Sequence, residues 1–201
     1  MAIAAASTSP TLWFITRGTG ITALVLLTIV MALGVANVRR LRTPTVPRFV
    51  LDAVHRNAAL LAVSFLVLHV LTTVLDSYVS ISPLAAIVPF ASSYKPLWIG
   101  LGAISLDLLL ALMITSLLRR RIGHRIWRAT HWVAYASWPV AMLHSLGAGT
   151  DAGSRWMLAI AGACTLVVAG AVALRLTGTY EQPQPAPRRP RATMTPSWSG
   201  R

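Results

Sequence analysis

The stretch HRNAALLAVSFLVLH, from His55 to His69, decides the fold that we expect, because it is a long apolar run with a histidine at each end. The apolar run continues to Leu75. It therefore reaches the ~20 helical residues that are needed to cross the ~30 Å hydrocarbon core of a membrane. A histidine in lipid carries a cost unless its imidazole has a partner, and an iron ion is one such partner.

A second apolar run, HWVAYASWPVAMLH, carries histidines at both ends as well, from His131 to His144. In all, five apolar runs are long enough to span a membrane, at residues 12–38, 55–75, 97–118, 130–146 and 155–174. Long continuous runs favour helices, since lipid demands that each segment satisfy its own backbone hydrogen bonds. We therefore predict an all-α, polytopic membrane bundle of five transmembrane helices.

The composition agrees with this prediction. Of the 201 residues, 55% are hydrophobic and only 11% are charged, which is typical of membrane proteins. The net charge of +13 would also suit a nucleic-acid-binding protein. Here, however, the arginines lie at the borders of the apolar runs, where anionic lipids attract them. We expect a multi-pass protein of the cell membrane with the lipid bilayer as its partner and no nucleic acid.

The arginines also predict the orientation of the chain. Fifteen of the 18 basic residues follow the first, third and fifth runs, while Arg17, Lys95 and Arg155 fall on the other side. Basic residues in short loops stay on the cytoplasmic side. We therefore expect the N-terminus outside and the C-terminus in the cytoplasm.

Two segments outside the runs have a distinct composition. Residues 179–201 are rich in proline and arginine, which predicts a disordered cytoplasmic tail after a transmembrane domain at residues 1–178. Such a tail cannot hold a folded flavin or nicotinamide domain. The loop at residues 77–96 is unusually apolar, and it predicts either a short interfacial helix or a loop that dips into the membrane surface.

The cysteine count limits the cofactor chemistry. Cys164 is alone, so a disulfide, an iron–sulfur ligand set and a CxxCH motif for covalent haem are all excluded. Any haem is expected to bind noncovalently. Cys164 itself lies within the fifth run, where we interpret it as a small packing residue.

The spacing of the histidines predicts which of them share a helix face. His55 and His69, fourteen residues apart, complete nearly four turns and lie on almost one face. His131 and His144, thirteen apart, lie ~140° out of register on an ideal helix. Pro139 stands between the second pair and is a candidate for the distortion that would align them, because proline removes a backbone donor and bends a helix.

The predicted topology pairs the histidines by depth. Both helices run from the cytoplasm to the outside, so His55 is expected near His131 on the inner side and His69 near His144 on the outer side. Each pair can hold one iron ion between two imidazoles, which predicts two stacked haems. The simpler alternatives are border residues that reach toward water for the inner pair, and hydrogen bonds to neighbouring helices for the outer pair.

These two histidine pairs, on spans separated by one intervening segment, resemble the ferric reductase-like transmembrane domain. That family includes NADPH oxidases, ferric reductases and the haem-binding membrane subunit of the bacterial methionine sulfoxide reductase system. The resemblance covers roughly residues 11–174. It implies two b-type haems with His55, His69, His131 and His144 as iron ligands, and the passage of single electrons across the membrane. It also implies that Arg17, near the outer end of the first span, binds haem propionates.

The chain differs from the family pattern in two ways that the sequence predicts. It has five expected spans where six are common, and it lacks an appended flavin and nicotinamide domain. We therefore expect an oxidoreductase component that receives electrons from a separate cytoplasmic flavoprotein, a flavodoxin or a membrane quinol. The expected acceptor is an extracytoplasmic protein or ferric iron. The alternatives are a haem-bearing anchor and electron-donor subunit of one extracytoplasmic reductase, or a haem-free structural or transport subunit.

Four further residues have alternative interpretations, and for a fifth, His124, we have one expectation. Asp107, within the third run, is either a proton relay or an acceptor that orients a ligand histidine, or else a packing residue. Trp138 either lies in the gap between haems or simply packs. Arg56 and Arg128 are inner propionate candidates or ordinary membrane anchors. His124, among arginines, is expected in a loop.

Overall fold

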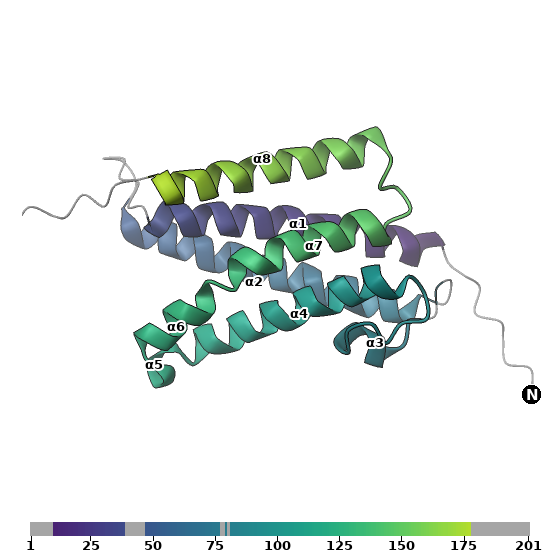
Figure 1. Cartoon of the computed structure of the whole chain (residues 1–201), viewed down its shortest axis with the longest axis horizontal. Coiled ribbons are helices and arrows are strands. Elements are labelled where there is room, and N and C mark those ends of the chain that lie inside the picture. The colour runs from purple at the N-terminus through teal and green to yellow at the C-terminus, as the bar shows by residue number, and fades with distance from the viewer. Residues whose placement is uncertain (1–9, 39–46, 77–78, 80, 178–201) are drawn as a thin grey trace, which may run out of the picture.

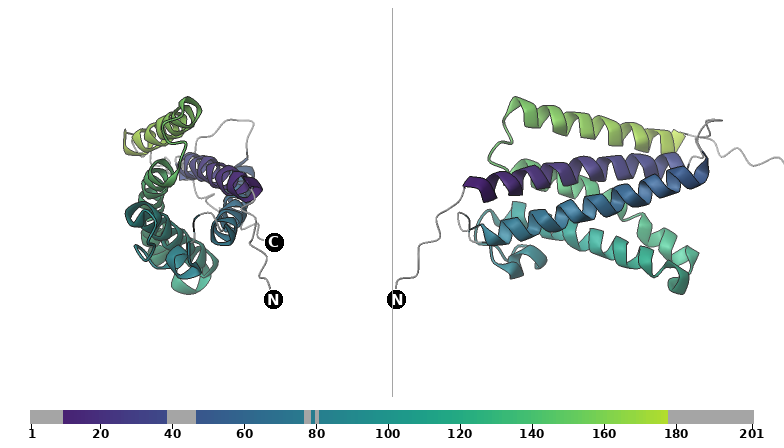
Figure 2. Two further views of the ribbon diagram at one scale, coloured as in Figure 1. Left: turned by 90° about the vertical axis from the view of Figure 1, so that its right-hand side faces the viewer. Right: turned by 180° about the vertical axis from the view of Figure 1, so that it is seen from behind.

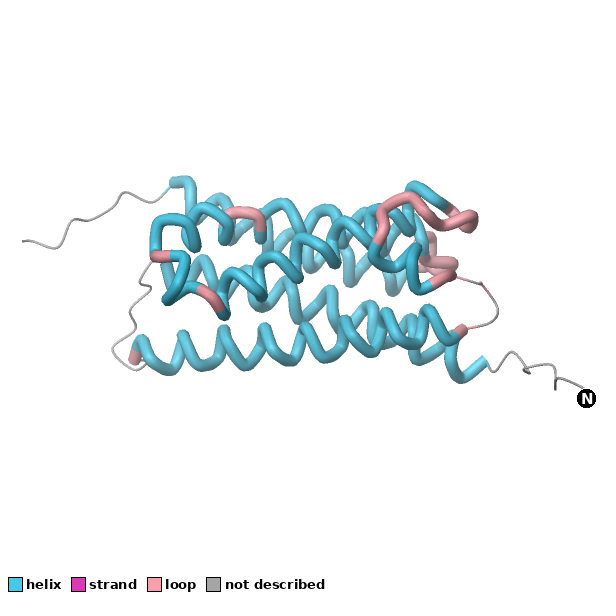
Figure 3. The backbone as a smooth tube through the Cα atoms, turned by 90° about the horizontal axis from the view of Figure 1, so that it is seen from below, coloured by secondary structure: helices cyan, strands magenta, loops and turns pink. Residues whose placement is uncertain are grey.

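The computed structural model describes residues 10–38, 47–76, 79 and 81–177, and the predicted tail at residues 179–201 lies outside these ranges. The described residues form helices joined by short loops and turns, and they contain no strand (Figure 3). The helices are α1 (Pro10–Val38), α2 (Arg48–Leu75), α3 (Pro83–Ile87), α4 (Pro96–Leu117), α5 (Arg119–Ile122), α6 (His124–His131), α7 (Ala134–Ala148) and α8 (Arg155–Thr177).

Four of these helices, α1, α2, α4 and α8, are long and apolar enough to cross a membrane. This finding confirms the prediction of an all-helical, multi-pass membrane protein. The fourth predicted span, at residues 130–146, is divided between α6 and α7. Because α7 has only 15 residues, its rise of ~22 Å is shorter than the hydrocarbon core. A fifth span therefore remains a prediction.

The helices form two closely packed antiparallel pairs that lie side by side. One pair is α1 with α2, and the other is α4 with α7 (Figure 1). The helix α7 also contacts α1, and α8 packs along α1 on the outside of the bundle (Figure 2). The buried core between these helices consists of Leu24, Trp138, Met142, Ala161, Cys164 and Val168. Cys164 is thus a buried core residue.

Large apolar side chains cover the outside of the bundle, as a lipid environment requires. Leu60 is 60% exposed and Leu166 is 75% exposed, for example, and many other leucines, isoleucines and valines are similar. In water this surface would be an extended apolar patch, whereas in a membrane it contacts lipid tails. Hydroxyl groups within the long helices donate to the carbonyl four residues earlier, as Ser64 does to Leu60, so that they need no water.

The charged residues divide between the two ends of the bundle. The basic residues on α5 and α6 and at the end of α8 lie at the left end of Figure 1, together with the start of α2. Arg17, Lys95 and Arg155 belong to the start of α1, the start of α4 and the start of α8, at the opposite end. The asymmetry agrees with the positive-inside pattern from which the orientation was predicted. We refer to the first end as the basic end and to the second as the opposite end.

The apolar loop before α4 contains a short helix, α3, of five residues. Ser82 begins it, because its hydroxyl accepts a hydrogen bond from the backbone N–H of Ala85 at 3.2 Å. Phe90, which has a positive φ of 66°, places its ring against Gly100 of α4. A Cβ atom at Gly100 would lie 2.3 Å from that ring, so glycine permits this close packing. The loop thus contains a short helix, which was one of the two alternatives predicted for it.

The break between α6 and α7 changes the relative orientation of His131 and His144. Between Ala129 and Ala136, four backbone N–H groups bond to the carbonyl three residues earlier. Such 3₁₀-type winding turns the chain ~20° more per residue than an α-helix does, or about 80° over four residues. That recovers more than half of the ~140° mismatch expected for an ideal helix. The distortion lies before Pro139, which is inside α7.

One buried hydrogen bond connects the two helix pairs. The indole N–H of Trp138, on α7, donates to the hydroxyl of Thr28, on α1, at 2.9 Å. The Thr28 hydroxyl in turn donates to the carbonyl of Leu24. Trp138 is only 7% exposed, so no water is available to replace this contact.

We predict that Thr28→Val destabilises the protein, because the indole N–H of Trp138 would lose its acceptor while the shape of the core stays nearly unchanged. The expected cost is about 1 kcal/mol. It should appear as a lower midpoint of thermal unfolding in detergent micelles. In a Trp138→Phe background, which has no indole N–H, Thr28→Val should lower the midpoint by less than it does in the wild type. Equal midpoints for wild type and Thr28→Val would contradict the prediction.

Candidate functional site

The two histidines that the sequence analysis predicted as the outer pair come together in the structure. His69, on α2, and His144, on α7, have ring centres 6.3 Å apart, with their planes at 76°. Two imidazoles that share one metal ion, each through a nitrogen ~2 Å from it, have ring centres about 6 Å apart. The two rings therefore stand at a separation that suits one metal ion between them.

Hydrogen bonds leave the same ring nitrogen available on both histidines. The Nδ1 of His69 lies 2.8 Å from the carbonyl oxygen of Thr16, and the Nδ1 of His144 lies 2.8 Å from that of Trp98. A carbonyl oxygen can only accept, so each Nδ1 carries the proton. The lone pair is then on Nε2. Imidazoles that ligate metals are held in this way, through the second nitrogen, by a backbone carbonyl or a carboxylate.

The inner pair is less symmetrical. The Nδ1 of His55 lies 3.1 Å from the carbonyl oxygen of Val30, on α1. His69 makes the same kind of contact with α1 through Thr16. The ring of His131 stacks on Trp127 with centres 5.0 Å apart, and its Nδ1 is buried without a hydrogen-bond partner. His55 belongs to the early part of α2 and His131 ends α6, so both lie toward the basic end of the bundle. The pairing of His55 with His131 stays a prediction.

Glycines on the neighbouring helices make room for three of the histidine rings. A Cβ atom at Gly20 would lie 2.8 Å from the Nδ1 of His69, and one at Gly102 would lie 2.6 Å from the Nδ1 of His144. A Cβ atom at Gly34 would lie 3.4 Å from the Cε1 of His55. Contacts under 3.0 Å are not tolerated without movement of the ring. Glycine is thus required at two of these positions and favourable at the third.

Each of these glycines follows its histidine's carbonyl acceptor by four residues, or about one helical turn. Gly20 and Gly34 are fourteen residues apart on α1, and His55 and His69 are fourteen apart on the antiparallel α2. The equal spacing puts both histidines of α2 in the same relation to α1. Our sequence interpretation missed these glycines, although the matched spacing was a signal that could have found them.

A cavity of about 250 Å³ lies beside the outer pair. His69 and His144 line it together with Gly20 and Gly102, and most of the other lining residues are apolar. Arg17 lies at this cavity as well. An apolar space with a few converging polar groups is typical of a cofactor site.

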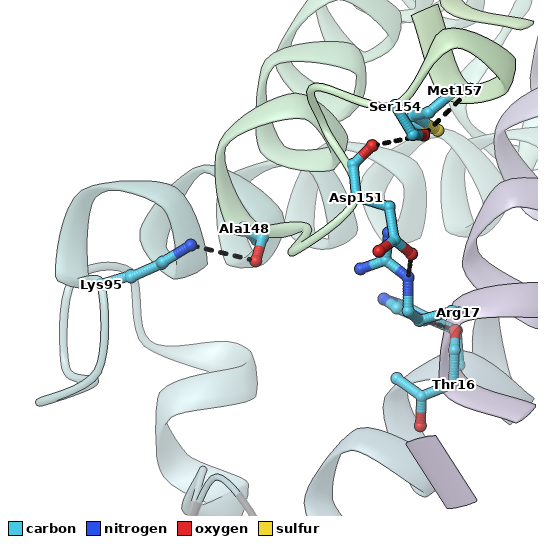
Figure 4. Close-up of polar contacts among 8 residues, drawn as sticks. Thr16, Arg17, Lys95, Ala148, Asp151, Ser154 and Met157 are labelled. Atoms are coloured by element: carbon cyan, nitrogen blue, oxygen red, sulfur yellow. Dashed lines mark hydrogen bonds and ion pairs between the residues drawn. The ribbon is translucent and has the colours of Figure 1, made fainter. Parts of the chain in front are cut away.

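Arg17 forms an ion pair with Asp151, which belongs to the turn between α7 and α8 (Figure 4). The Nε of Arg17 is 2.8 Å from a carboxylate oxygen of Asp151, and the two side chains are 17% and 31% exposed. The guanidinium also lies 5.4 Å from the centre of the Trp13 ring. Arg17 therefore lies at the cavity that His69 and His144 line, with its charge balanced by Asp151.

Lys95 connects the same region to the end of α7. Its Nζ donates to the carbonyl oxygens of Gly147 at 3.2 Å and of Ala148 at 3.4 Å (Figure 4). These carbonyls belong to the last turn of α7, where a cation is favoured by the helix dipole and by the unpaired carbonyl groups. Lys95 thus fixes the end of the helix that carries His144.

The other candidate residues lie outside the two histidine pairs. Arg56 and Arg128 are exposed at the basic end, and Asp107 is half-buried on α4 and does not line the cavity. Trp138 is buried on α7, and in the sequence it lies between His131, the last residue of α6, and His144 on α7. His124 begins α6 with its ring near Trp127, so it belongs to a helix rather than to the expected loop.

The sequence model of the ferric reductase-like transmembrane component matches residues 19–142. The match covers more than half of the chain, and the chain therefore belongs to this family, whose role is membrane electron transfer. The matched range contains His55, His69 and His131 and ends two residues before His144. No curated protein and no solved structure matches the chain significantly.

We predict that Asp151→Asn lowers stability by about 1 kcal/mol or less, because a partly buried ion pair loses its charge while the side-chain shape is kept. The measurement is thermal unfolding in detergent at low salt and at 1 M salt. Salt screens the wild-type pair, so the difference between wild type and variant should shrink at 1 M salt. A salt-independent difference would show that the ion pair is not its origin.

Proposed function

We propose that the chain is a di-haem b electron-transfer protein, which passes single electrons from a donor on the cytoplasmic side to an acceptor outside the membrane. The observation that carries the proposal is the arrangement of His69 and His144. Their Nδ1–H groups are held by backbone carbonyls, their Nε2 atoms are left for coordination, and their ring centres are 6.3 Å apart.

In this proposal His69 and His144 hold the outer haem, and His55 and His131 hold the inner one. When bound, haem supplies an iron ion that gains and loses one electron. The carbonyls of Thr16, Val30 and Trp98 fix ring orientation for three of the four ligands. Their hydrogen bonds also make the imidazoles stronger electron donors toward a metal ion.

The residues around the outer pair support a flat, partly anionic group. Gly20 and Gly102 have no side chains that would fill the space beside the two rings. The remaining lining of the cavity is mainly apolar, which disfavours water. Arg17 supplies a cation at the same cavity, suited to a propionate carboxylate. Asp151 holds the Arg17 guanidinium and keeps its charge from being isolated in an apolar setting.

The proposal includes the topology that the sequence predicted. Together α6 and α7 extend from His124 to Ala148, and we propose that this broken segment is the fifth membrane crossing. The basic end would then face the cytoplasm, in agreement with the positive-inside rule. The inner pair would lie nearest to the donor, which we propose to be a separate flavoprotein, a flavodoxin or a membrane quinol. The outer pair would lie nearest to ferric iron or an acceptor protein.

Haem content tests the proposal directly. Purified wild-type protein should give about two b-type haems per chain by pyridine haemochrome assay, with absorption changes on addition of dithionite. His55→Ala and His69→Ala should each lower the content, because each variant removes one proposed iron ligand from a different site. A matched control is His124→Ala, which changes a histidine outside both pairs and should keep the wild-type value.

The result that would contradict the proposal is equally clear. Protein without b-type absorption would favour the haem-free structural or transport subunit. Unchanged haem content in both ligand variants would show that the histidine pairs are not the ligands. If haem is present but ferric iron is not reduced, ferric iron is not the acceptor, and the result would favour the alternative of a haem-bearing anchor and electron donor for one extracytoplasmic reductase.

Two glycines on one helix separate site effects from general helix effects. In Gly20→Ala the new methyl group meets the His69 ring, whereas in Gly18→Ala it meets nothing within 4 Å. Both substitutions raise helix propensity equally. We predict that Gly20→Ala loses most of one haem per chain and that Gly18→Ala retains both, measured by the same haemochrome assay. Equal haem content in the two variants would mean that the Gly20 contact does not control ligand position.

A further inference from the structure

Two buried side-chain nitrogen atoms near the predicted inner histidine pair have no hydrogen-bond partner among the described residues. They are the Nδ1 of His131 and an Nη atom of Arg175. His131 ends α6, while Arg175 lies in the last turn of α8. Buried polar groups normally have partners, because an unpaired donor costs ~1–3 kcal/mol. When the Nε2 of His131 coordinates a metal ion, both nitrogen atoms are donors that need an acceptor from outside the two helices.

Aromatic rings hold the guanidinium of Arg175 in place. Its Cζ lies 4.5 Å from the centre of the Trp132 ring and 5.5 Å from that of Tyr135. Both rings belong to the tightly wound segment that follows His131, so the break between α6 and α7 also builds the surface on which Arg175 rests. Trp132 directly follows His131 in the chain, so the contact with Trp132 places the guanidinium of Arg175 on the segment next to His131. A cation held beside a second N–H donor is suited to an anion.

Protein carboxylates do not fill this role in the described part of the chain. The acidic residues there are Asp52, Asp76, Asp107 and Asp151. Of these, Asp52 lies near the basic end, where it accepts a hydrogen bond from Asn37 at the end of α1. Most of the charged residues at the basic end are arginines, among them Arg119, Arg120, Arg121, Arg125 and Arg128. Such a surface attracts the anionic headgroups of a membrane leaflet.

We propose that His131 and Arg175 bind a phosphate-class oxyanion, which is either the headgroup phosphate of an anionic lipid or free phosphate. The oxyanion accepts hydrogen bonds from the Nδ1–H of His131 and from the Arg175 guanidinium, with Trp132 and Tyr135 as the wall of the site. The inference rests on the proposed function in one respect, since coordination through Nε2 is what makes the Nδ1 of His131 a donor.

The oxyanion would accept the Nδ1–H hydrogen bond of His131, as backbone carbonyls do for His55, His69 and His144. A hydrogen bond from Nδ1–H strengthens the imidazole as a ligand, and a nearby negative charge favours the ferric state. Anion binding should therefore shift the midpoint potential of one haem component to a lower value. The component associated with His69 and His144 should stay unchanged, because its two acceptors are backbone carbonyls.

Lipid retention tests the site without reference to haem. We would compare full-length wild type, Arg175→Gln and the control Arg128→Gln, which removes an exposed arginine at the same end. Native mass spectrometry after purification from phosphatidylglycerol-containing micelles should show one retained phosphatidylglycerol that is lost in Arg175→Gln only. Arg175→Lys should retain it in part, since the charge is kept. Equal retention by wild type and Arg175→Gln would overturn a lipid as the source.

Redox titration then distinguishes the two sources of the anion. In nanodiscs of neutral phosphatidylcholine, adding phosphatidylglycerol should lower the midpoint potential of one component in wild type and leave Arg175→Gln unchanged. If inorganic phosphate with neutral lipid gives the same shift, free phosphate is the ligand. If neither addition has an effect on wild type, and no lipid is retained, the site does not exist. Absence of haem would refute the proposed function, while the lipid measurement would still test Arg175.

Discussion

The hydrogen bond from a histidine Nδ1–H to a backbone carbonyl on the neighbouring helix is the interaction on which the candidate site depends. It occurs at His55, His69 and His144, each time with a glycine one turn after the acceptor. The acceptor orients the ring, and the glycine lets the helix approach it. Because all three acceptors belong to the main chain, the geometry follows from helix register rather than from any particular polar side chain.

Helix register also explains how much of the site could be predicted from the sequence. The fourteen-residue spacing in α2 places His55 and His69 on almost one face, and the structure puts His144 beside His69. The pairing of His55 with His131 by depth, which the arginines suggest, stays a prediction. The glycine contacts and the Arg17–Asp151 ion pair depend on which helices become neighbours. Which helices pack against each other is a property of the whole bundle, and the periodicity of a single apolar run does not predict it.

The break within the fourth predicted span could not be predicted from the pattern of that span alone. An apolar run with an inner proline predicts a bent helix, and attention falls on Pro139. The structure instead tightens the chain ahead of the proline, between Ala129 and Ala136, and ends α6 at His131. Apolar composition alone does not reveal this, because α-helical and 3₁₀ turns bury similar side chains. The consequence is functional as well as local, since the same break positions Trp132 and Tyr135 beside Arg175.

The outer histidines belong to different halves of the bundle. His69 is bonded to α1 within the α1–α2 pair, and His144 is bonded to α4 within the α4–α7 pair. The space between their rings is therefore also the seam between two separately packed units. A group that coordinates both imidazoles joins those units as a cross-link does, and its binding energy adds to the cohesion of the folded chain. Cofactor loading and assembly of the bundle would then be one coupled equilibrium.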